Sequence, residues 1–453
     1  MTSLGQLADR HERLYQRHSD MFGTQERNSV ALIADTEYLR TFAGQVTWAV
    51  LANLTARLYK GIHRLCIVVE PEIERLPRVF FPNSKPTIRD ASVDLIKALH
   101  PDASFLEERG MPEGTQWIRV YVGGACAAGD DALSVAGRGW GAFINDQGWK
   151  LLPDDGNPIG ALVAACLGAA EIYKRLYAMR SADFRKSTVF SAYDYSVAPE
   201  GGPSLPREIN LPRTFIPGAG AIGMAVLLLL HSLPVHSSNG LLPIDFDHLD
   251  DTNLNRCILA VLADLNPAQL KIDIVKARVD AVRLGLDPQN EHWEEFAKRS
   301  EYADPRSFER IISCVDRYEA RRAVQYLKPP RILFTGGTGD FLLNVSRHIL
   351  DDGLACGLCY QARDPEPACA TASDGSQHAF EAPIDPSIGF VSVLAGILLG
   401  VEYLKEIIGA PPLRNHLRVK TLFAQASVRA REKDPNCNCS SKFVAAGYKA
   451  TWR

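Results

Sequence analysis

Short apolar runs alternate with longer helical patterns along the first half of the chain. Residues 29–34 form an apolar run, residues 36–58 have a helix-like pattern, and residues 65–70 form a second run that ends in an acid. A further apolar run covers residues 118–123, and residues 158–174 read as a helix of small residues. Strands that alternate with helices in this way predict an α/β unit with a mainly parallel sheet covered by helices.

The second half of the chain shows the same order of elements. Its predicted strands begin at Thr214 and cover residues 242–246, 310–315 and 331–335. Its last long helical segment, residues 386–405, shares with residues 158–174 an Ile-Gly near its start and a Glu-x-x-Lys at its end. We therefore predict an α/β protein with two tandem Rossmann-like repeats, although two unrelated Rossmann-like domains would give a similar pattern.

The boundaries of the repeats follow from a stretch rich in Ser, Pro, Gly and Tyr, residues 179–213. Such a composition is typical of an interdomain connection. We place one domain at residues 1–180, a linker at 181–210 and a second domain at 211–453.

Composition and charge narrow the classes of partner. The net charge of −3 gives no overall basic field, so we expect no nucleic-acid partner. The N-terminus lacks the apolar core of a signal peptide, and the longest apolar runs, residues 225–230 and 390–401, are too short or too glycine-broken to span a bilayer. We predict a cytoplasmic protein without a membrane partner, in which the ten cysteines are not expected to form disulfides.

A glycine-rich turn marks the candidate nucleotide site. Gly218, Gly220 and Gly223 stand between a predicted strand and a predicted helix, whose free amides suit phosphate. Asp245, in the motif Asp-Phe-Asp with Asp247, ends the next strand, where an acid can bind ribose hydroxyls. These features alone would suit NAD or FAD equally well. The matching turn of the first half, residues 34–37, has no glycine and two carboxylates, so we read the first half as a degenerate copy without nucleotide.

Three further groups of polar residues suggest phosphate and metal chemistry. Asn253-Leu-Asn-Arg256 stands at a helix entry, where a guanidinium can bind phosphate oxygens; a solvent-exposed helix arginine is the alternative. Lys276 and Arg278 form a basic pair in an amphipathic stretch. Asp316 ends a buried strand, where it can hold the Mg²⁺ of ATP or cap the following helix.

Five cysteines need their own explanation. Cys356, Cys359, Cys437 and Cys439 form two close pairs that can close a tetrahedral zinc site, with free or redox-active thiols as the alternative. Cys369 lies in a polar stretch, where it is either a nucleophile or an exposed cysteine without a role.

The order of these motifs resembles the ThiF-type superfamily, which includes adenylyltransferases for sulfur-carrier proteins and ubiquitin-activating enzymes. The resemblance covers nearly all of residues 210–453 and is weak in the first half. The sequence departs from the family pattern at Cys257, where Gln is usual, and at Arg317, where Asn is common. It implies that the active second domain ends in a crossover loop and a zinc-bound tail.

The resemblance also implies roles for the candidate residues. It implies that Asp245 holds the ribose, with Asp247 in the same motif, and that Asp316 holds Mg²⁺. Phosphate contacts would come from Asn253, Arg256 and one of the pair Lys276 and Arg278.

Two residues outside the nucleotide motifs receive roles by the same comparison. Arg17, in a segment similar to the family's Tyr-x-Arg-Gln opening, would reach the ATP phosphates from the inactive copy, as the partner arginine does in relatives. Cys369 would form a thioester on a loop that crosses the substrate tail.

The activity implied is ATP-dependent adenylation of the C-terminal glycine of a ubiquitin-like protein, followed by thioester formation and transfer to a conjugating enzyme. The fused layout resembles activating enzymes of bacterial conjugation operons linked to antiphage defence. The chain would be a pseudo-dimer that is free to dimerise further. The alternatives are a sulfur-carrier adenylyltransferase, which normally lacks a fused inactive half, a non-catalytic scaffold partner, and an NAD(P)-dependent oxidoreductase, which has no use for the Asn-Leu-Asn-Arg motif.

Overall fold

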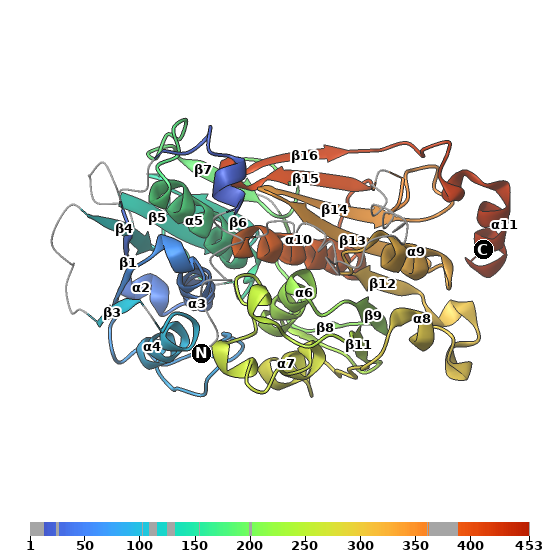
Figure 1. Cartoon of the computed structure of the whole chain (residues 1–453), viewed down its shortest axis with the longest axis horizontal. Coiled ribbons are helices and arrows are strands. Elements are labelled where there is room, and N and C mark those ends of the chain that lie inside the picture. Colours follow the sequence, from blue (N-terminus) through green and yellow to red (C-terminus); the bar gives the residue numbers. More distant parts are fainter. Residues whose placement is uncertain are drawn as a thin grey trace, which may run out of the picture.

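The structure is a computed structural model that describes most of the chain. The described residues are 13–23, 27–101, 103–107, 116–124, 132–153, 155–198, 202–359, 361 and 388–452. Over this part of the chain the strands form two seven-stranded sheets and one small two-stranded sheet (Figure 1).

The first sheet has the strand order β3-β2-β1-β4-β5-β6-β7. Its first five strands pair in parallel, and the last two continue it in antiparallel fashion. Their bounds are β1 Ser29–Ala34, β2 Arg64–Val68, β3 Ser104–Glu107, β4 Trp117–Val122, β5 Ala132–Arg138, β6 Gly141–Ile144 and β7 Thr188–Ser191.

The second sheet has the order β11-β9-β12-β13-β14-β15-β16. Strands β11, β9, β12 and β13 are parallel, whereas β14, β15 and β16 are antiparallel additions. Their bounds are β9 Thr214–Pro217, β11 Leu241–Ile244, β12 Arg310–Ser313, β13 Ile332–Gly339, β14 Leu342–His348, β15 His416–Lys420 and β16 Gln425–Arg429. The small sheet pairs β8 (Ile209–Asn210) with β10 (Val235–His236).

The predicted α/β class with parallel strands is confirmed, and the antiparallel edges were not predicted. Both large sheets place their first strand inside the sheet and end in antiparallel strands. This likeness is what a duplication would produce, and the duplication itself stays a prediction. The predicted linker, residues 181–210, contains β7, which completes the first sheet.

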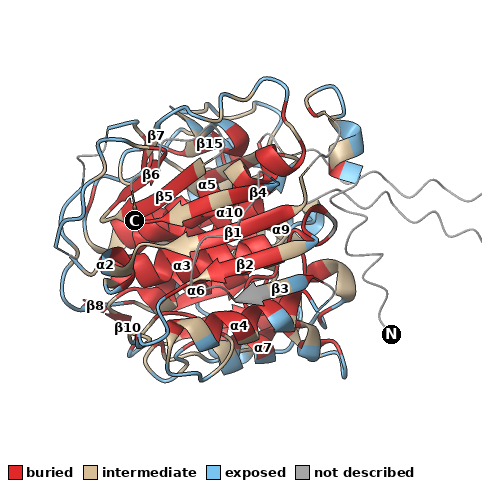
Figure 2. Ribbon diagram, turned by 90° about the vertical axis from the view of Figure 1, so that its left-hand side faces the viewer, coloured by how far each residue is buried: buried red, intermediate tan, exposed pale blue. Residues whose placement is uncertain are grey.

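Four apolar helices pack between the two sheets. They are α3 (Phe42–Ala56), α5 (Ile159–Leu176), α6 (Ala221–Ser232) and α10 (Gly389–Ile407), and nearly every residue of each is buried. Helix α10 contacts both α6 and α5, and α5 contacts α3, so the buried centre joins the two halves of the chain (Figure 2). A helix that is apolar on all sides must be covered on all sides.

The remaining helices are shorter or lie nearer the surface. They are α2 Thr36–Leu39, α4 Ile88–Leu99, α7 Lys271–Arg278, α8 Trp293–Phe296, α9 Tyr318–Tyr326 and α11 Lys442–Trp452. The 3₁₀ turns are η1 Tyr59–Gly61, η2 Asp251–Asn253, η3 Leu262–Asp264, η4 Ser300–Tyr302, η5 Pro305–Ser307, η6 Thr421–Phe423 and η7 Asn438–Ser440. Among the described residues, none of the helices combines the length and apolarity needed to cross a bilayer.

The close approach of α10 to α6 gives a test of this core. A Cβ added at Gly396 would lie 2.4 Å from the Ile222 carbonyl oxygen and 2.5 Å from Ala225 Cβ. We expect Gly396→Ala to lower the free energy of unfolding by about 1–3 kcal/mol in chemical denaturation, because the two helices must move apart.

Gly447→Ala in α11 is the matched control, since no described atom lies within 4 Å of its added Cβ. That variant should be neutral or stabilising by up to about 1 kcal/mol. Equal stability of Gly396→Ala and the wild type would contradict the packing described.

Candidate functional site

The glycine turn joins β9 to α6 with little room for side chains. Gly218 has φ +93°, which favours glycine, and a Cβ there would lie 2.9 Å from the Cys314 carbonyl oxygen. A Cβ at Gly223 would lie 2.1 Å from the Gly218 carbonyl oxygen. Gly220 is the N-cap of α6, so the free amides of the first helical turn follow directly. The three glycines therefore shape a helix N-terminus that a phosphate can approach.

A cleft of about 1580 Å³ opens beside this turn. It lies at the carboxyl ends of the parallel strands β9, β11 and β12, where open α/β sheets bind their ligands. Most of the residues predicted for the nucleotide site line it: Arg17, Gly218, Gly220, Asp245, Asp247, Asn253, Arg256 and Asp316. Gly223 is not among the lining residues and instead allows the turn to close.

Asp245 directly follows β11 and ties this strand to the glycine turn. One carboxylate oxygen accepts a hydrogen bond from the Ala219 amide at 2.6 Å, and the other accepts one from the Asp247 amide at 2.8 Å. Burial raises the pKa of Asp245, and these two hydrogen bonds oppose that rise. The carboxylate is therefore held rigidly at the cleft wall.

Lys271, which the sequence analysis did not select, is the basic residue that α7 brings to the cleft. Its Nζ donates to Asp247 Oδ2 at 2.8 Å, and its side chain is only 10% exposed. Burial opposes the charged form of Lys271, but the hydrogen bond to Asp247 and the charge of Asp245 outweigh it and raise the pKa. A buried ammonium group beside two acids is thus fixed in the cleft.

The structure does not bring Lys276 or Arg278 into the cleft. Lys276 is exposed, and Arg278 donates to Asp264 Oδ1 at 2.9 Å and to the Pro82 carbonyl at 2.7 Å. Helix α7 explains the difference, because a rise of about 1.5 Å per residue places Arg278 roughly 10 Å beyond Lys271 along the axis. The sequence held no signal that separates Lys271 from Lys276, because both are basic residues of α7.

Arg256 lines the cleft from the segment that follows η2. Its Nη1 donates to the Thr252 carbonyl at 2.6 Å and to Asn255 Oδ1 at 2.9 Å. Asn253 is buried at the end of η2 and also lines the cleft. The neighbouring Cys257 is a buried thiol whose pKa is raised by burial, so the residue that departs from the family pattern is a neutral part of the cleft wall.

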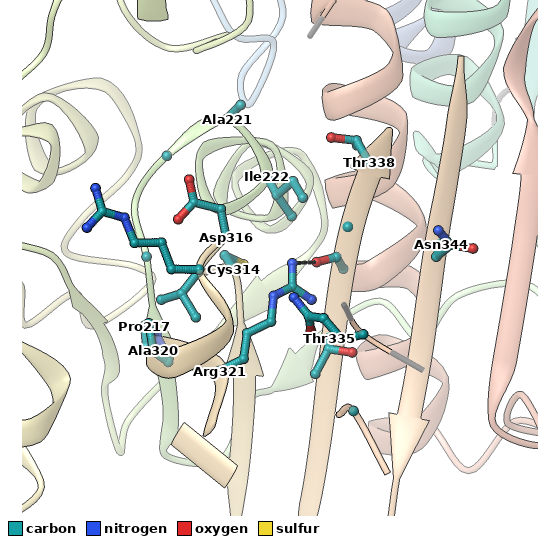
Figure 3. A pocket seen from close by; sticks show the side chains of 18 of the residues that line it. Pro217, Ala221, Ile222, Cys314, Asp316, Ala320, Arg321, Thr335, Thr338 and Asn344 are labelled. Atoms are coloured by element: carbon teal, nitrogen blue, oxygen red, sulfur yellow. Dashed lines mark hydrogen bonds between the residues drawn. The ribbon is translucent and has the colours of Figure 1, made fainter. Parts of the chain in front are cut away.

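Asp316 is exposed to the cleft just beyond β12. Figure 3 shows Asp316 among the residues that line the pocket, with Ala221, the first residue of α6, above it in the view. The N-cap of α9 is Arg317, so Asp316 does not cap this helix. An exposed carboxylate next to a phosphate-binding turn fits the oxygen ligands that Mg²⁺ prefers.

Arg17 reaches the same cleft from the first half of the chain. Its Nη1 lies 2.8 Å from Asp340 Oδ1, on the turn between β13 and β14. The adjacent His18 contacts the other oxygen of Asp340 at 3.1 Å, and its ring lies against Phe341. These contacts hold the N-terminal segment at the mouth of the cleft.

The corresponding turn of the first half is filled by a side chain. Asp35 caps α2 directly after β1, and Tyr38 on this helix packs where a Cβ at Gly123 would lie. The Tyr38 hydroxyl donates to the Gly137 carbonyl at 2.7 Å and bonds Thr47 Oγ1 at 2.8 Å. The Tyr38 ring lies at the end of β4, the strand next to β1 in the first sheet. The strand in the same position of the second sheet is β12, next to β9, and the cleft is open at its end.

The four paired cysteines form one cluster. The ligand atoms of Cys356, Cys359, Cys437 and Cys439 all lie within 4.8 Å of one another. The Cys356–Cys437 and Cys359–Cys439 sulfur pairs are 3.5 and 3.4 Å apart. A tetrahedral zinc with bonds of about 2.3 Å places its sulfurs about 3.8 Å apart, so the donor set fits a zinc ion.

Backbone amides of Leu358 and Asp434 donate to the cluster sulfurs, as is common for thiolate ligands. The Tyr326 hydroxyl lies 3.9 Å from both Cys356 and Cys437 sulfurs. The cluster thereby links the segment after β14 to the start of α11. Cys369, the predicted thioester residue, lies outside the described residues.

Comparison with known proteins identifies the family of the chain. Residues 196–441 match the ThiF family, and because this match covers more than half of the sequence, the chain belongs to that family. The resemblance drawn from the motifs is confirmed at this level.

Two curated relatives are similar over part of the chain. One is named Uncharacterized protein y4jF, from Sinorhizobium fredii, and is 26% identical over 346 residues, or 74% of this chain and 60% of that protein. The other is human Ubiquitin-like modifier-activating enzyme 7, 27% identical over 196 residues, or 40% of this chain and 18% of that protein. The chain thus spans less than two thirds of the length of either relative.

The cysteine cluster gives a test by metal analysis. We expect the purified protein to hold about one zinc ion per chain, and Cys439→Ser to lose it together with thermal stability, because three thiolates bind zinc more weakly than four. Cys314→Ala, which removes a buried thiol outside the cluster, should keep the zinc. Zinc-free wild-type protein, or full zinc content in Cys439→Ser, would rule out the metal site.

Proposed function

We propose that this chain uses Mg·ATP to adenylate the C-terminal glycine carboxylate of a ubiquitin-like protein. The observation that carries the proposal is the cleft in the ThiF-family part of the chain. Its wall combines a helix N-terminus, two acids after β11, the cations Arg256 and Lys271, and Asp316 after β12. This set of groups suits a nucleoside triphosphate.

The reaction transfers an adenylyl group. An oxygen of the glycine carboxylate attacks the α-phosphorus, the bond between that phosphorus and the bridging oxygen breaks, and pyrophosphate leaves with the bonding electrons. In this proposal Arg256, Lys271 and the amides of α6 stabilise the charge that builds on the phosphate oxygens. Asp245 would bind the ribose hydroxyls, and Asp316 would hold Mg²⁺, which neutralises phosphate charge when bound.

Three features favour this activity over the alternatives. Human Ubiquitin-like modifier-activating enzyme 7 is a partial relative, which supports a ubiquitin-like substrate. The lysine and arginine of the cleft suit the transfer of a nucleotidyl group, because they can stabilise charge on the phosphate oxygens. A scaffold without activity would not need the ammonium group of Lys271 in the cleft beside Asp247. A sulfur-carrier protein remains the second candidate substrate, since it presents the same terminal glycine.

The later steps of the proposed pathway rest on the sequence. Cys369 would attack the acyl-adenylate, forming a thioester and releasing AMP, before transfer to a conjugating enzyme. The first half would serve as an inactive duplicate in a pseudo-dimer, an interpretation that Tyr38 supports by filling the corresponding turn. A role in bacterial antiphage defence and a cytoplasmic location complete the proposal.

Exchange of labelled pyrophosphate into ATP tests the adenylation step. The wild type should catalyse this exchange only when a ubiquitin-like protein ending in Gly is added. An exchange that needs no such protein, or none with a panel of ubiquitin-like and sulfur-carrier proteins, would count against the activity. A response to sulfur carriers alone would favour the second candidate.

The two lysines of α7 allow a matched comparison in the same assay. We expect Lys271→Ala to raise the KM for ATP roughly 10- to 100-fold, because a charged hydrogen bond to phosphate is lost. Lys276→Ala, five residues along the same helix and exposed, should leave KM unchanged. If Lys276→Ala raised the KM for ATP and Lys271→Ala did not, Lys276 would be the phosphate contact, as the sequence suggested.

Replacing Cys369 separates the two chemical steps. Cys369→Ala should retain pyrophosphate exchange and lose the thioester, seen as an adduct on gels that reducing agent removes. Cys369→Ser should form an adduct that resists reducing agent, because an oxyester replaces the thioester. A reducible adduct in Cys369→Ala would show that another cysteine carries the substrate.

A further inference from the structure

A buried arginine of the first half binds the backbone of the segment that carries Arg256. Arg57 is the C-cap of α3 and is 1% exposed. Its guanidinium donates hydrogen bonds to three carbonyl oxygens of the second half: those of Leu254, Ile258 at 3.1 Å and Ala260 at 2.7 Å. One side chain therefore holds both ends of a stretch of seven residues, 254–260.

A second residue of α3 completes this contact. Asn53 Oδ1 accepts from Arg57 Nε at 2.7 Å, and Asn53 Nδ2 donates to the Ile258 carbonyl at 3.1 Å. The two side chains, one turn apart on the helix, act as a single clamp, which we call the α3 clamp (Asn53 and Arg57). It belongs to the first half of the chain and binds only backbone atoms of the second half in these contacts.

The clamp fixes a segment that has little regular structure of its own. Residues 254–260 follow the short turn η2 and belong to none of the described helices or strands. Carbonyl groups buried in such a segment need donors from elsewhere, because unsatisfied ones oppose folding. Arg57 supplies those donors, although burial disfavours its charged form and lowers its pKa. The positive charge of Arg57 is thus buried, and its guanidinium group satisfies three buried carbonyl groups.

The clamped segment carries candidate phosphate contacts. Arg256 lies between the clamped carbonyls of Leu254 and Ile258, and its side chain enters the cleft. Asn253 immediately precedes the clamped stretch and also lines the cleft. Any shift of this backbone therefore moves both groups relative to the glycine turn.

We propose that Arg57 is a positioning residue for the nucleotide site. By holding residues 254–260 from behind, it keeps Asn253 and Arg256 where they meet the ATP phosphates. The inference rests on the proposed function, and it gives the first half a task beyond that of Arg17: the first half builds one wall of the site in the second half. A second half expressed alone would lack this support.

The closing experiment measures ATP affinity in variants of the clamp. We expect Arg57→Met to bind a non-hydrolysable ATP analogue about 10- to 100-fold more weakly, since small misplacements of binding groups have effects of this size. Arg57→Lys and Asn53→Ala remove fewer of the hydrogen bonds. These folded variants should bind the analogue more weakly than the wild type but more tightly than Arg57→Met. These milder variants decide the question if Arg57→Met does not fold.

Arg283 offers a matched control. It donates to the carbonyls of His231 at 2.6 Å, Leu233 at 3.0 Å and Val235, and it is not among the residues that line the cleft. Arg283→Met should lose thermal stability as Arg57→Met does, yet keep the wild-type affinity for the analogue. Equal weakening of affinity in both variants would mean that general destabilisation explains the effect, and would overturn the positioning role.

Hydrogen exchange separates this proposal from the proposed function. Without nucleotide, amide protection in residues 254–260 should fall in Arg57→Met and persist in Arg283→Met. Wild-type protection and wild-type affinity in Arg57→Met would overturn the inference. If the clamp variants weaken analogue binding as expected but the wild type never catalyses pyrophosphate exchange, the positioning role stands and the proposed adenylation falls.

Discussion

The structure depends on the burial of four apolar helices between two sheets. Helices α3, α5, α6 and α10 are buried on nearly all sides, so neither half of the chain can cover its own helices alone. Each half provides a sheet and two of these helices, and the contact between α5 and α10 joins them. Burial of this apolar surface is the main force that holds the halves in one arrangement.

The cleft follows from this arrangement. The parallel strands of the second sheet bring the glycine turn, Asp245 and Asp316 to one edge. The packing of the first half against that edge adds Arg17 at the mouth and Arg57 behind the wall. The first half, which has no glycine in its corresponding turn, therefore contributes residues to the candidate site of the second half.

The nucleotide turn, the acid after β11 and the cysteine cluster could be predicted from the sequence, because each depends on a local pattern of residues. A glycine turn between a strand and a helix, and an acid at a strand end, have fixed places in a parallel sheet. The cysteine pairs were predicted for a similar reason, since only a few donor sets bind zinc. Strands β1, β4 and β9 were found because buried parallel strands are short continuous apolar runs.

The rest depends on contacts that no local pattern encodes. Lys271 could not be distinguished from Lys276 until α7 was oriented, because both are basic residues of one helix. The antiparallel strands β14, β15 and β16 extend the second sheet beyond β13, and their order in the sheet is set by distant partners. Arg57 looks in sequence like any arginine that follows a helix, and its role appears only when the carbonyls of residues 254–260 are placed beside it.

The proposed function requires one ATP site per chain, in the second half. Calorimetric titration with a non-hydrolysable ATP analogue in the presence of Mg²⁺ can count the sites. We expect one site per chain, no binding of NAD, and loss of the site when Arg256 and Lys271 are both replaced by alanine. Binding of NAD at the same site, two ATP sites per chain, or undiminished ATP binding in the double variant would contradict the proposed function.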